Sequence, residues 1–160
     1  MMMQNNWNIN QDKWDDILPI VYNKNWRNVT FNYNRRDMIP QERGIYMVVI
    51  SSSFLSKKEP FKLLQTPFYV GMSTTLKTRF ASHTNTRIDY DNLLKRLGVF
   101  LRNSKFFYLI LPQYTQENLK YIEQTLIDCF GCFGNKINSV SKEKIKTIKT
   151  KILEGVKHGE

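Results

Sequence analysis

Arg79, His83 and Glu123 are residue types that phosphate chemistry requires, and the chain spaces them so that they can act together. Arginine carries a permanent positive charge, and its planar fork can bind two oxygens of one phosphate. Arg79 and His83 are four residues apart in a helical pattern, so they share one helix face. Glu123 is one of few acids in the basic part of the chain, and a single carboxylate with open positions suits Mg²⁺. The absence of a carboxylate cluster argues against a two-metal site.

Three predicted strands must position these side chains. Residues 44–50 are apolar at every position, which is typical of a central strand covered on both faces. Residues 68–71 resume the sheet and end at Gly71, a glycine that permits close approach of another group. Residues 105–111 are the third strand, and residues 51–67 are a polar loop with a basic centre.

Helices are predicted on both sides of these strands. Asn10 is an N-cap for a helix over about 11–22, and residues 23–42 are a loop or a weak strand around 29–33. Further helices have the following predicted limits: Thr74 or Thr75 to about His83, a segment after Asp89, Thr115 to about Phe130, and a basic helix over 141–156. The fold class is therefore α+β, a small three-stranded and mainly antiparallel sheet flanked by helices, with an N-terminal helical extension.

The order of five short motifs resembles the GIY-YIG nuclease family over about residues 43–139. The motifs are Gly44-Ile45-Tyr46, Tyr69-Val70-Gly71, Arg79, Glu123 within Ile122–Ile127, and Asn135. Residues 51–67 are then an insertion, since they make the connection between the two tyrosines longer than is usual in the family. Met72 stands where many members carry a polar or basic residue. Asn135 is favoured as the site asparagine by its spacing from Glu123, with Asn138 as the alternative.

The resemblance implies a nuclease domain over residues 43–160, which includes the C-terminal helix, and an extension over residues 1–42 that packs on it. It implies a Mg²⁺-dependent endonuclease that hydrolyses DNA, with Mn²⁺ as an alternative cation at Glu123. Tyr46 is then the general base, and because an unperturbed tyrosine pKa is about 10, nearby cations or a metal-bound water must favour its phenolate. Tyr69 would orient water or phosphate, and His83 could assist proton transfer. The alternatives are an RNase or structure-specific nuclease with the same site, and a catalytically silent nucleic-acid-binding module.

The charge distribution also favours a polyanionic partner, in first place double-stranded DNA. The formal net charge is +10 at pH 7, and residues 1–42 are neutral, so the remainder of the chain carries the whole excess. Beside the predicted site, the residues expected to contact the nucleic-acid backbone are Lys57, Lys58, Lys62, Lys77 and Arg87, with the lysines of the last helix. A Lys-rich surface that only keeps the protein soluble is the simpler alternative.

Several other classes are disfavoured by composition. The longest apolar runs are far shorter than the roughly 20 residues that a membrane-spanning helix needs. The first residues lack the basic and apolar regions of a secretory signal, which predicts a cytoplasmic protein without a membrane partner. Cys129 and Cys132 lack two further ligands at a standard zinc spacing and close a helical pattern, so they are predicted to be structural free thiols. No small-molecule cofactor is expected.

Overall fold

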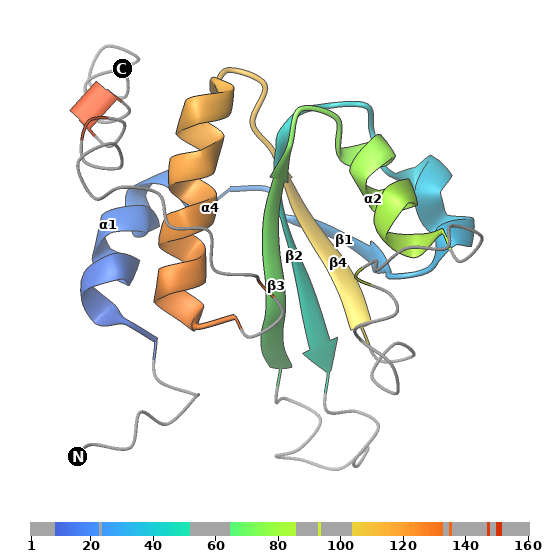
Figure 1. Ribbon diagram of the computed structural model, residues 1–160, viewed down its shortest axis with the longest axis horizontal. Helices are drawn as coiled ribbons and strands as arrows, with labels where there is room; N and C mark the ends of the chain where they lie inside the picture. The colour runs from blue at the N-terminus through green and yellow to red at the C-terminus, as the bar shows by residue number, and fades with distance from the viewer. Residues whose placement is uncertain are drawn as a thin grey trace.

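The computed structural model describes residues 9–22, 24–51, 65–85 and 104–132, together with positions 93, 135, 147, 150 and 151. Its elements are α1 (Gln11–Val21), β1 (Arg27–Thr30), the 3₁₀ helix η1 (Tyr33–Met38), β2 (Gly44–Ser51), β3 (Gln65–Ser73), α2 (Leu76–Thr84), β4 (Ser104–Ile110) and α4 (Gln116–Phe130) (Figure 1). The predicted helix after Asp89, most of the insertion and most of the C-terminal helix lie outside these residues. None of the helices described is long and apolar enough to cross a membrane.

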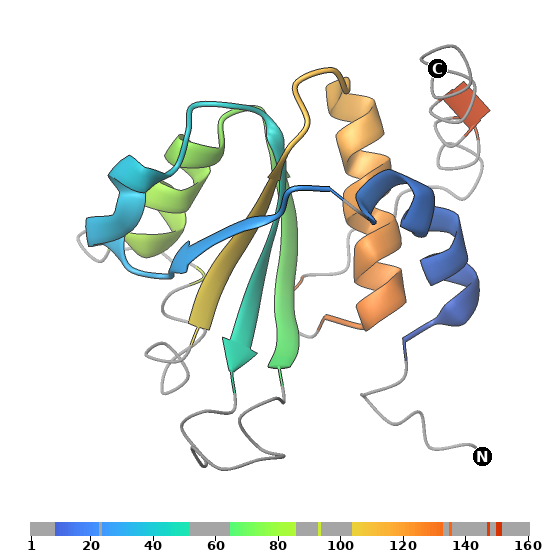
Figure 2. The same cartoon turned by 180° about the vertical axis from the view of Figure 1, so that it is seen from behind.

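The sheet confirms the predicted α+β class but has four strands in the order β1-β4-β2-β3, all paired antiparallel. The prediction of three strands is wrong because β1, inside residues 1–42, pairs along β4 at the edge of the sheet (Figure 2). Residues 51 and 65–67 also belong to β2 and β3 rather than to the predicted loop, because their backbones continue the ladder between these two strands.

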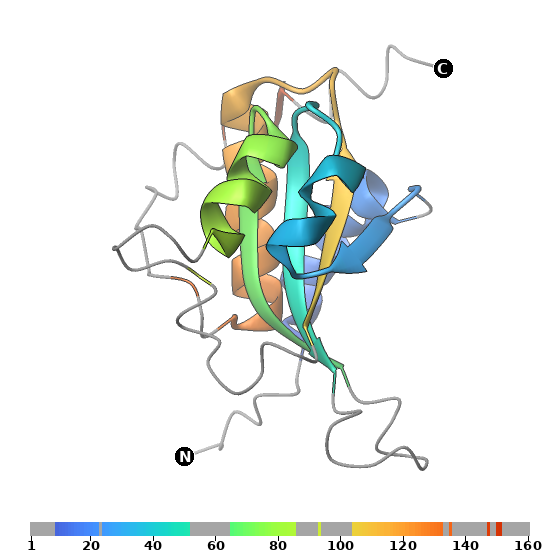
Figure 3. The same cartoon turned by 90° about the vertical axis from the view of Figure 1, so that its right-hand side faces the viewer.

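The sheet is covered on both faces, as the uniformly apolar sequence of β2 predicts. Ile45 packs in one cluster with side chains of α1 and α4, whereas Tyr46 and Val48 pack in a second cluster with side chains of α2. The alternation follows from the strand geometry, in which successive side chains point to opposite faces. In Figure 3, α2 and η1 lie in front of the sheet, and α1 and α4 lie behind it. Tyr46 is therefore on the α2 face.

α1 begins as predicted, at an N-cap made by the Asn10 side chain, which accepts a hydrogen bond from the Lys13 backbone N–H at 3.2 Å. Pro19 lies inside the helix and does not end it before Val21. The helix packs along α4 (Figure 2). Trp14 meets Phe130 edge to face with ring centroids 6.1 Å apart. Within residues 1–42, α1 thus covers one face of the sheet and β1 extends one of its edges.

An apolar pocket of about 380 Å³ remains between α1, α4 and the sheet. Its walls include Trp14 and Tyr22 of the α1 segment, Phe130 of α4, and Met47 and Phe107 of the sheet. None of the described residues that line it is charged. A phosphate needs cationic or N–H partners, so this pocket is unsuited to hold one. It also lies on the face of the sheet opposite to Tyr46.

Candidate active site

Residues of the predicted site meet beside β3, which is an edge strand of the sheet. α2 approaches β3 from one face of the sheet and α4 from the other, as Figure 3 shows from the α2 side. The contributing side chains come from segments far apart in sequence: Tyr46 from β2, Tyr69 from β3, Arg79 and His83 from α2, Glu123 from α4, and Asn135 after α4.

Tyr46 is fully buried at the centre of this arrangement. Its hydroxyl oxygen lies 2.6 Å from Nε2 of His83, which is the distance of a short hydrogen bond. Its ring stacks on Phe106 at 4.9 Å and lies parallel to Tyr69 at 6.0 Å between centroids. Gly71 is its cross-strand partner, and a Cβ there would come within 2.3 Å of the Tyr46 hydroxyl. Gly71 thus leaves room for the Tyr46 side chain, rather than for another backbone or a ligand.

The protein's own groups raise the pKa of Tyr46 well above 10. Burial is the largest cause, the neighbouring Tyr69 adds to it, and the negative charge of Glu123 acts in the same direction. Arg79 lowers this pKa but is outweighed. The expectation that nearby cations favour the phenolate is therefore not met by these side chains. Tyr46 is a neutral phenol at pH 7, and its hydroxyl shares a hydrogen bond with Nε2 of His83.

Glu123 is half-buried on the side of α4 that faces β3. Thr115 caps this helix as predicted, and the buried Leu119, Ile122 and Leu126 fix its face against the sheet. One carboxylate oxygen accepts a hydrogen bond from the Met72 backbone N–H at 3.1 Å. Burial raises the pKa of Glu123 to about 7, although the Met72 N–H and the charges of Arg79 and Lys120 lower it. Its carboxylate therefore changes charge close to neutral pH.

Arg79 stands on the exposed flank of α2. The buried residues Leu76, Phe80 and His83 hold the helix on the sheet, which leaves Arg79 beside the β3 edge. Its charge lowers the pKa of both Tyr46 and Glu123, so it acts on the two groups at once. The N-cap position of α2 is Thr75, one of the two predicted, but its own side chain makes no cap hydrogen bond.

Asn135 holds the outer edge of β3 through its side-chain amide. Oδ1 accepts a hydrogen bond from the Val70 backbone N–H at 3.0 Å, and Nδ2 donates to the Val70 carbonyl oxygen at 2.6 Å. The amide therefore occupies the place that a further strand would take on this edge. Because Tyr69 and Gly71 flank Val70, Asn135 positions the strand that carries the site. Asn138, the alternative, lies outside the described residues.

Tyr69 completes the aromatic part of the site. It is half-buried, and its ring meets the His83 ring edge to face with centroids 5.5 Å apart. It lies diagonally across from Tyr46 on β2, since the register pairs Val48 with Tyr69. Its exposed part leaves it able to contact a ligand, which the buried Tyr46 ring is less able to do.

The structure does not bring Lys77 to this site. Its ammonium nitrogen lies 3.1 Å from a carboxylate oxygen of Asp37, on the η1 side of α2. Lys57, Lys58, Lys62 and Arg87 lie outside the described residues. Cys129 and Cys132 are buried free thiols as predicted, and burial raises the pKa of Cys132 to about 12.

Sequence reasoning missed two partners in the site. The Met72 N–H that binds Glu123 is a backbone group, so the identity of residue 72 carries no signal for it. The role of Gly71 as the floor under the Tyr46 hydroxyl depends on the strand register, which a glycine at a strand end does not reveal.

Glu123 is the residue in this site that could hold a divalent cation. In the part of the chain that the structure describes, no group of three or more histidine, cysteine, aspartate or glutamate side chains gathers. A dedicated cage is thus not formed by these residues. A single carboxylate still fits Mg²⁺, which keeps several waters and takes substrate phosphate as a further ligand. One oxygen of Glu123 accepts the Met72 N–H, and the other oxygen is the natural ligand atom.

Comparison with known proteins leaves the site to be judged on its geometry. No protein-family model matches the chain, and no curated protein is significantly similar to it.

Proposed function

We propose that this chain is a metal-dependent endonuclease of the GIY-YIG type that hydrolyses phosphodiester bonds in DNA. The observation that carries the proposal is the 2.6 Å contact between the Tyr46 hydroxyl and His83, in a site whose electrostatics include Arg79 and Glu123. A proton-transfer pair, a permanent cation and a carboxylate are the parts that phosphodiester hydrolysis needs. Their convergence from β2, α2 and α4 supports one shared function over four unrelated roles.

The proposed chemistry divides between two ends of the site. Arg79 compensates charge that develops on the phosphoryl oxygens during attack by water. Glu123 would hold Mg²⁺, which when bound supplies further positive charge to the phosphate. Tyr69, half-buried and at the same edge, orients the water or the phosphate.

Tyr46 and His83 account for the proton of the attacking water. Since burial raises the pKa of Tyr46, a phenolate formed in advance is unfavourable. The hydroxyl can instead give its proton to neutral His83 Nε2 while its oxygen accepts a proton from the water. The phenol remains neutral before and after this exchange, and the positive charge appears on His83. The short hydrogen bond thus takes the place of the lowered tyrosine pKa that a phenolate base would need.

The raised pKa of Glu123 favours an enzyme over a silent binding module. Burying a carboxylate until its pKa reaches about 7 destabilises the folded protein at neutral pH. A module that only binds nucleic acid gains nothing from that arrangement. A cation-binding carboxylate does, because the cation offsets the destabilisation. An RNase or a structure-specific nuclease with the same site is the remaining alternative, since these side chains do not read the sugar.

A substrate panel tests the proposal. The pure protein is incubated with supercoiled plasmid, single-stranded DNA and RNA, each with Mg²⁺ or with EDTA, beside a Glu123→Ala variant. We expect nicking and linearisation of the plasmid with Mg²⁺ alone, and none by the variant. Cleavage of RNA alone would transfer the proposal to an RNase. No cleavage of any substrate, or full activity of Glu123→Ala, would contradict it.

A further inference from the structure

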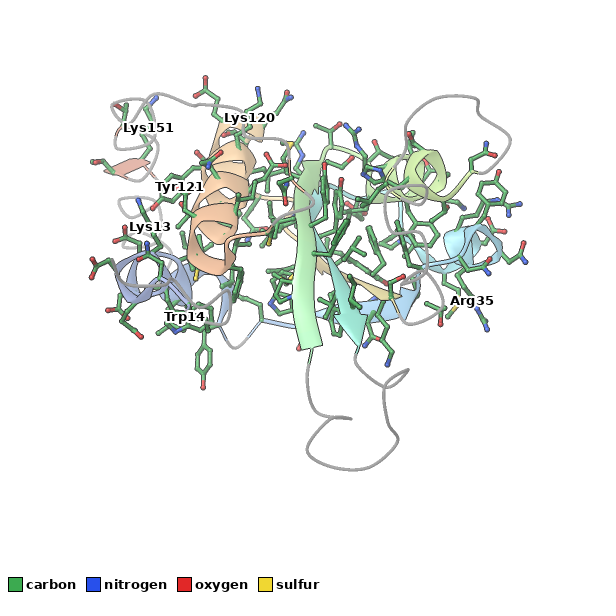
Figure 4. The ribbon with its side chains drawn as sticks, turned by 60° about the horizontal axis from the view of Figure 1, so that its bottom comes forward. Lys13, Trp14, Arg35, Lys120, Tyr121 and Lys151 are labelled. Atoms are coloured by element: carbon green, nitrogen blue, oxygen red, sulfur yellow. The ribbon has the colours of Figure 1, made fainter. Side chains whose placement is uncertain are left out.

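The 3₁₀ helix η1 presents two arginines beside α2, on the flank of α2 that faces away from the candidate active site. Arg35 and Arg36 are in the last turn of η1, and Arg35 is exposed. Figure 4 shows Arg35 at the outer end of η1, on the opposite side of the molecule from Lys13 and Trp14 of α1. η1 lies directly against α2. Residues 1–42 have no net charge as a whole, so the local concentration of positive charge at η1 does not show in their charge count.

η1 is fixed at both ends, so its arginines are presented in a defined place. Phe31 before it and Ile39 after it are buried in the cluster on the α2 face. The Asn32 side chain caps the turn by accepting a hydrogen bond from the Asn34 N–H at 2.9 Å. The Ile39 N–H closes it on the Arg36 carbonyl oxygen. A contact made by these arginines therefore involves little ordering of backbone.

The charges around η1 leave it positive. Asp37 is its acid, and Lys77 of α2 lies 3.1 Å from that carboxylate and lowers its pKa. Arg36 lies over the Tyr33 ring at 4.4 Å, which orients the guanidinium, and is 4.0 Å from Asp37. Arg35 contacts the Met38 sulfur at 3.9 Å, a weak acceptor that a phosphate oxygen would displace. Arg36 also donates to the Tyr33 carbonyl oxygen at 3.3 Å, so the exposed Arg35 has more of its N–H donors available for an anion.

The position of η1 sets the distance between such an anion and the candidate active site. Lys77 and Arg79 stand on opposite flanks of α2, on either side of the buried row that includes Phe80. The two flanks of a helix are about 10–12 Å apart. An anion at η1 is therefore separated from the candidate active site by at least the width of α2.

We propose that Arg35 and Arg36 bind the phosphate backbone of duplex DNA, on the flank of α2 opposite to the bond held beside Arg79 and Glu123. The inference rests on the proposed function and extends it with a second point of attachment. DNA that lies across α2 would be held on both flanks, which fixes its direction relative to the site. A backbone contact is the expected mode, because arginine forks match phosphate and no base-reading element is involved.

The test is the salt dependence of binding to a fluorescent DNA duplex in EDTA, measured by anisotropy between about 50 and 200 mM salt. The Arg35→Gln/Arg36→Gln protein is compared with a Lys13→Gln/Lys24→Gln control, which removes the same charge from the α1 side. Each lost phosphate contact lowers the slope of log affinity against log salt by about 0.9. We expect a reduction of up to about 1.8 for the arginine variant and none for the control. An Arg35→Lys/Arg36→Lys protein should retain most of the slope.

The outcomes separate this inference from the proposed function. Cleavage by the wild-type protein with an unchanged slope in Arg35→Gln/Arg36→Gln overturns the η1 contact alone. If the wild-type protein cleaves no substrate but Arg35→Gln/Arg36→Gln lowers the slope, the η1 contact is supported and the proposed nuclease activity is rejected. Equal reductions of the slope in Arg35→Gln/Arg36→Gln and in the Lys13→Gln/Lys24→Gln control would show a general charge effect and overturn the contact. A slope that the arginine substitutions lower for RNA but not for duplex DNA would also overturn the contact, because the contact is proposed for duplex DNA. Matching far-ultraviolet spectra and melting temperatures verify that all three variants fold.

Discussion

Glu123 is less favourable as an anion inside the protein than in water, since burial raises its pKa from 4.5 to about 7. The folded protein therefore holds this proton between these two pH values while the unfolded chain has lost it. By linkage, the free energy of unfolding falls as pH rises from about 4.5 to 7 and stays lowered above that. The loss is on the order of 3 kcal/mol, because a difference of one between the folded and unfolded pKa corresponds to about 1.4 kcal/mol.

Glu123→Gln should accordingly stabilise the protein at high pH. Glutamine keeps an oxygen for the Met72 N–H and has no proton to lose. We expect urea unfolding in EDTA to give a gain of ~2–3 kcal/mol at pH 8 and little gain at pH 4. Glu117→Gln, which changes an exposed glutamate of the same helix, is the control and should show no gain at pH 8. Identical pH dependence of wild type and Glu123→Gln would show that this carboxylate is not destabilised.

The same titration should govern cleavage. Below about pH 7 the Glu123 carboxyl is protonated and cannot bind a cation, so the rate should fall about tenfold for each step of one in pH. Because Mg²⁺ competes with the proton, a higher Mg²⁺ concentration should move the midpoint of this fall to lower pH. Initial rates across pH at two Mg²⁺ concentrations measure the effect. A midpoint that does not move would place the titrating group away from the cation.

At the scale of elements, sequence signals that act within a few residues predicted the structure well. The caps of α1 and α4 at Asn10 and Thr115 are side-chain hydrogen bonds to a backbone N–H three residues on. Gly131 ends α4 at a φ of 60°, the left-handed conformation that a glycine tolerates. The unbroken apolar run of β2 predicted a strand covered on both faces. Each signal is local in the chain or reflects complete burial.

Elements that depend on distant partners were predicted less well. β1 has four residues, of which Val29 alone is buried, so its sequence carries almost no alternation. Its strand conformation follows from pairing with β4, more than seventy positions later in the chain. The cap of α2 shows the same effect on a smaller scale. There, the first N–H groups of the helix, those of Leu76 and Lys77, donate to the distant carbonyl oxygens of Glu42 and Pro40 rather than to a threonine side chain.

Gly71→Ala tests how β3 supports the site. The new Cβ would lie 2.2 Å from Cζ of Tyr46, so the ring must move away from His83 or β3 must shift. We expect a destabilisation of about 1–3 kcal/mol from overpacking and a large loss of cleavage. Gly131→Ala is a matched control, because it strains a left-handed residue by about 1–2 kcal/mol while its Cβ has no atom of the described residues within 4 Å.

The two glycine variants should thus differ in activity more than in stability. Melting temperatures give the first quantity and single-turnover cleavage the second. Wild-type cleavage by Gly71→Ala would mean that the Tyr46 hydroxyl need not sit above this glycine.

At the scale of the whole molecule, the site is an assembly around one edge strand. The motif order predicted a set of residues, of which Tyr46, Tyr69, Arg79, His83 and Glu123 lie in β3 or in elements beside it, and Asn135 bonds to β3 from after the end of α4. Sequence could not predict how they meet. The direction in which the Tyr46 pKa shifts depends on burial against Phe106 and Tyr69. The role of Asn135 depends on which backbone groups of β3 face outward. Both are properties of the complete sheet.

The most direct test of the central claim is single-turnover cleavage of DNA by Tyr46→Phe in Mg²⁺. Phenylalanine keeps the ring that packs against Phe106 and removes only the hydroxyl that meets His83. Affinity for the duplex in EDTA and the far-ultraviolet spectrum serve as controls for binding and folding. We predict a rate at least about 10² lower than that of the wild-type protein, the scale for loss of one proton-transfer group. Cleavage at the wild-type rate would contradict the account, because the proton would then leave the attacking water by another route.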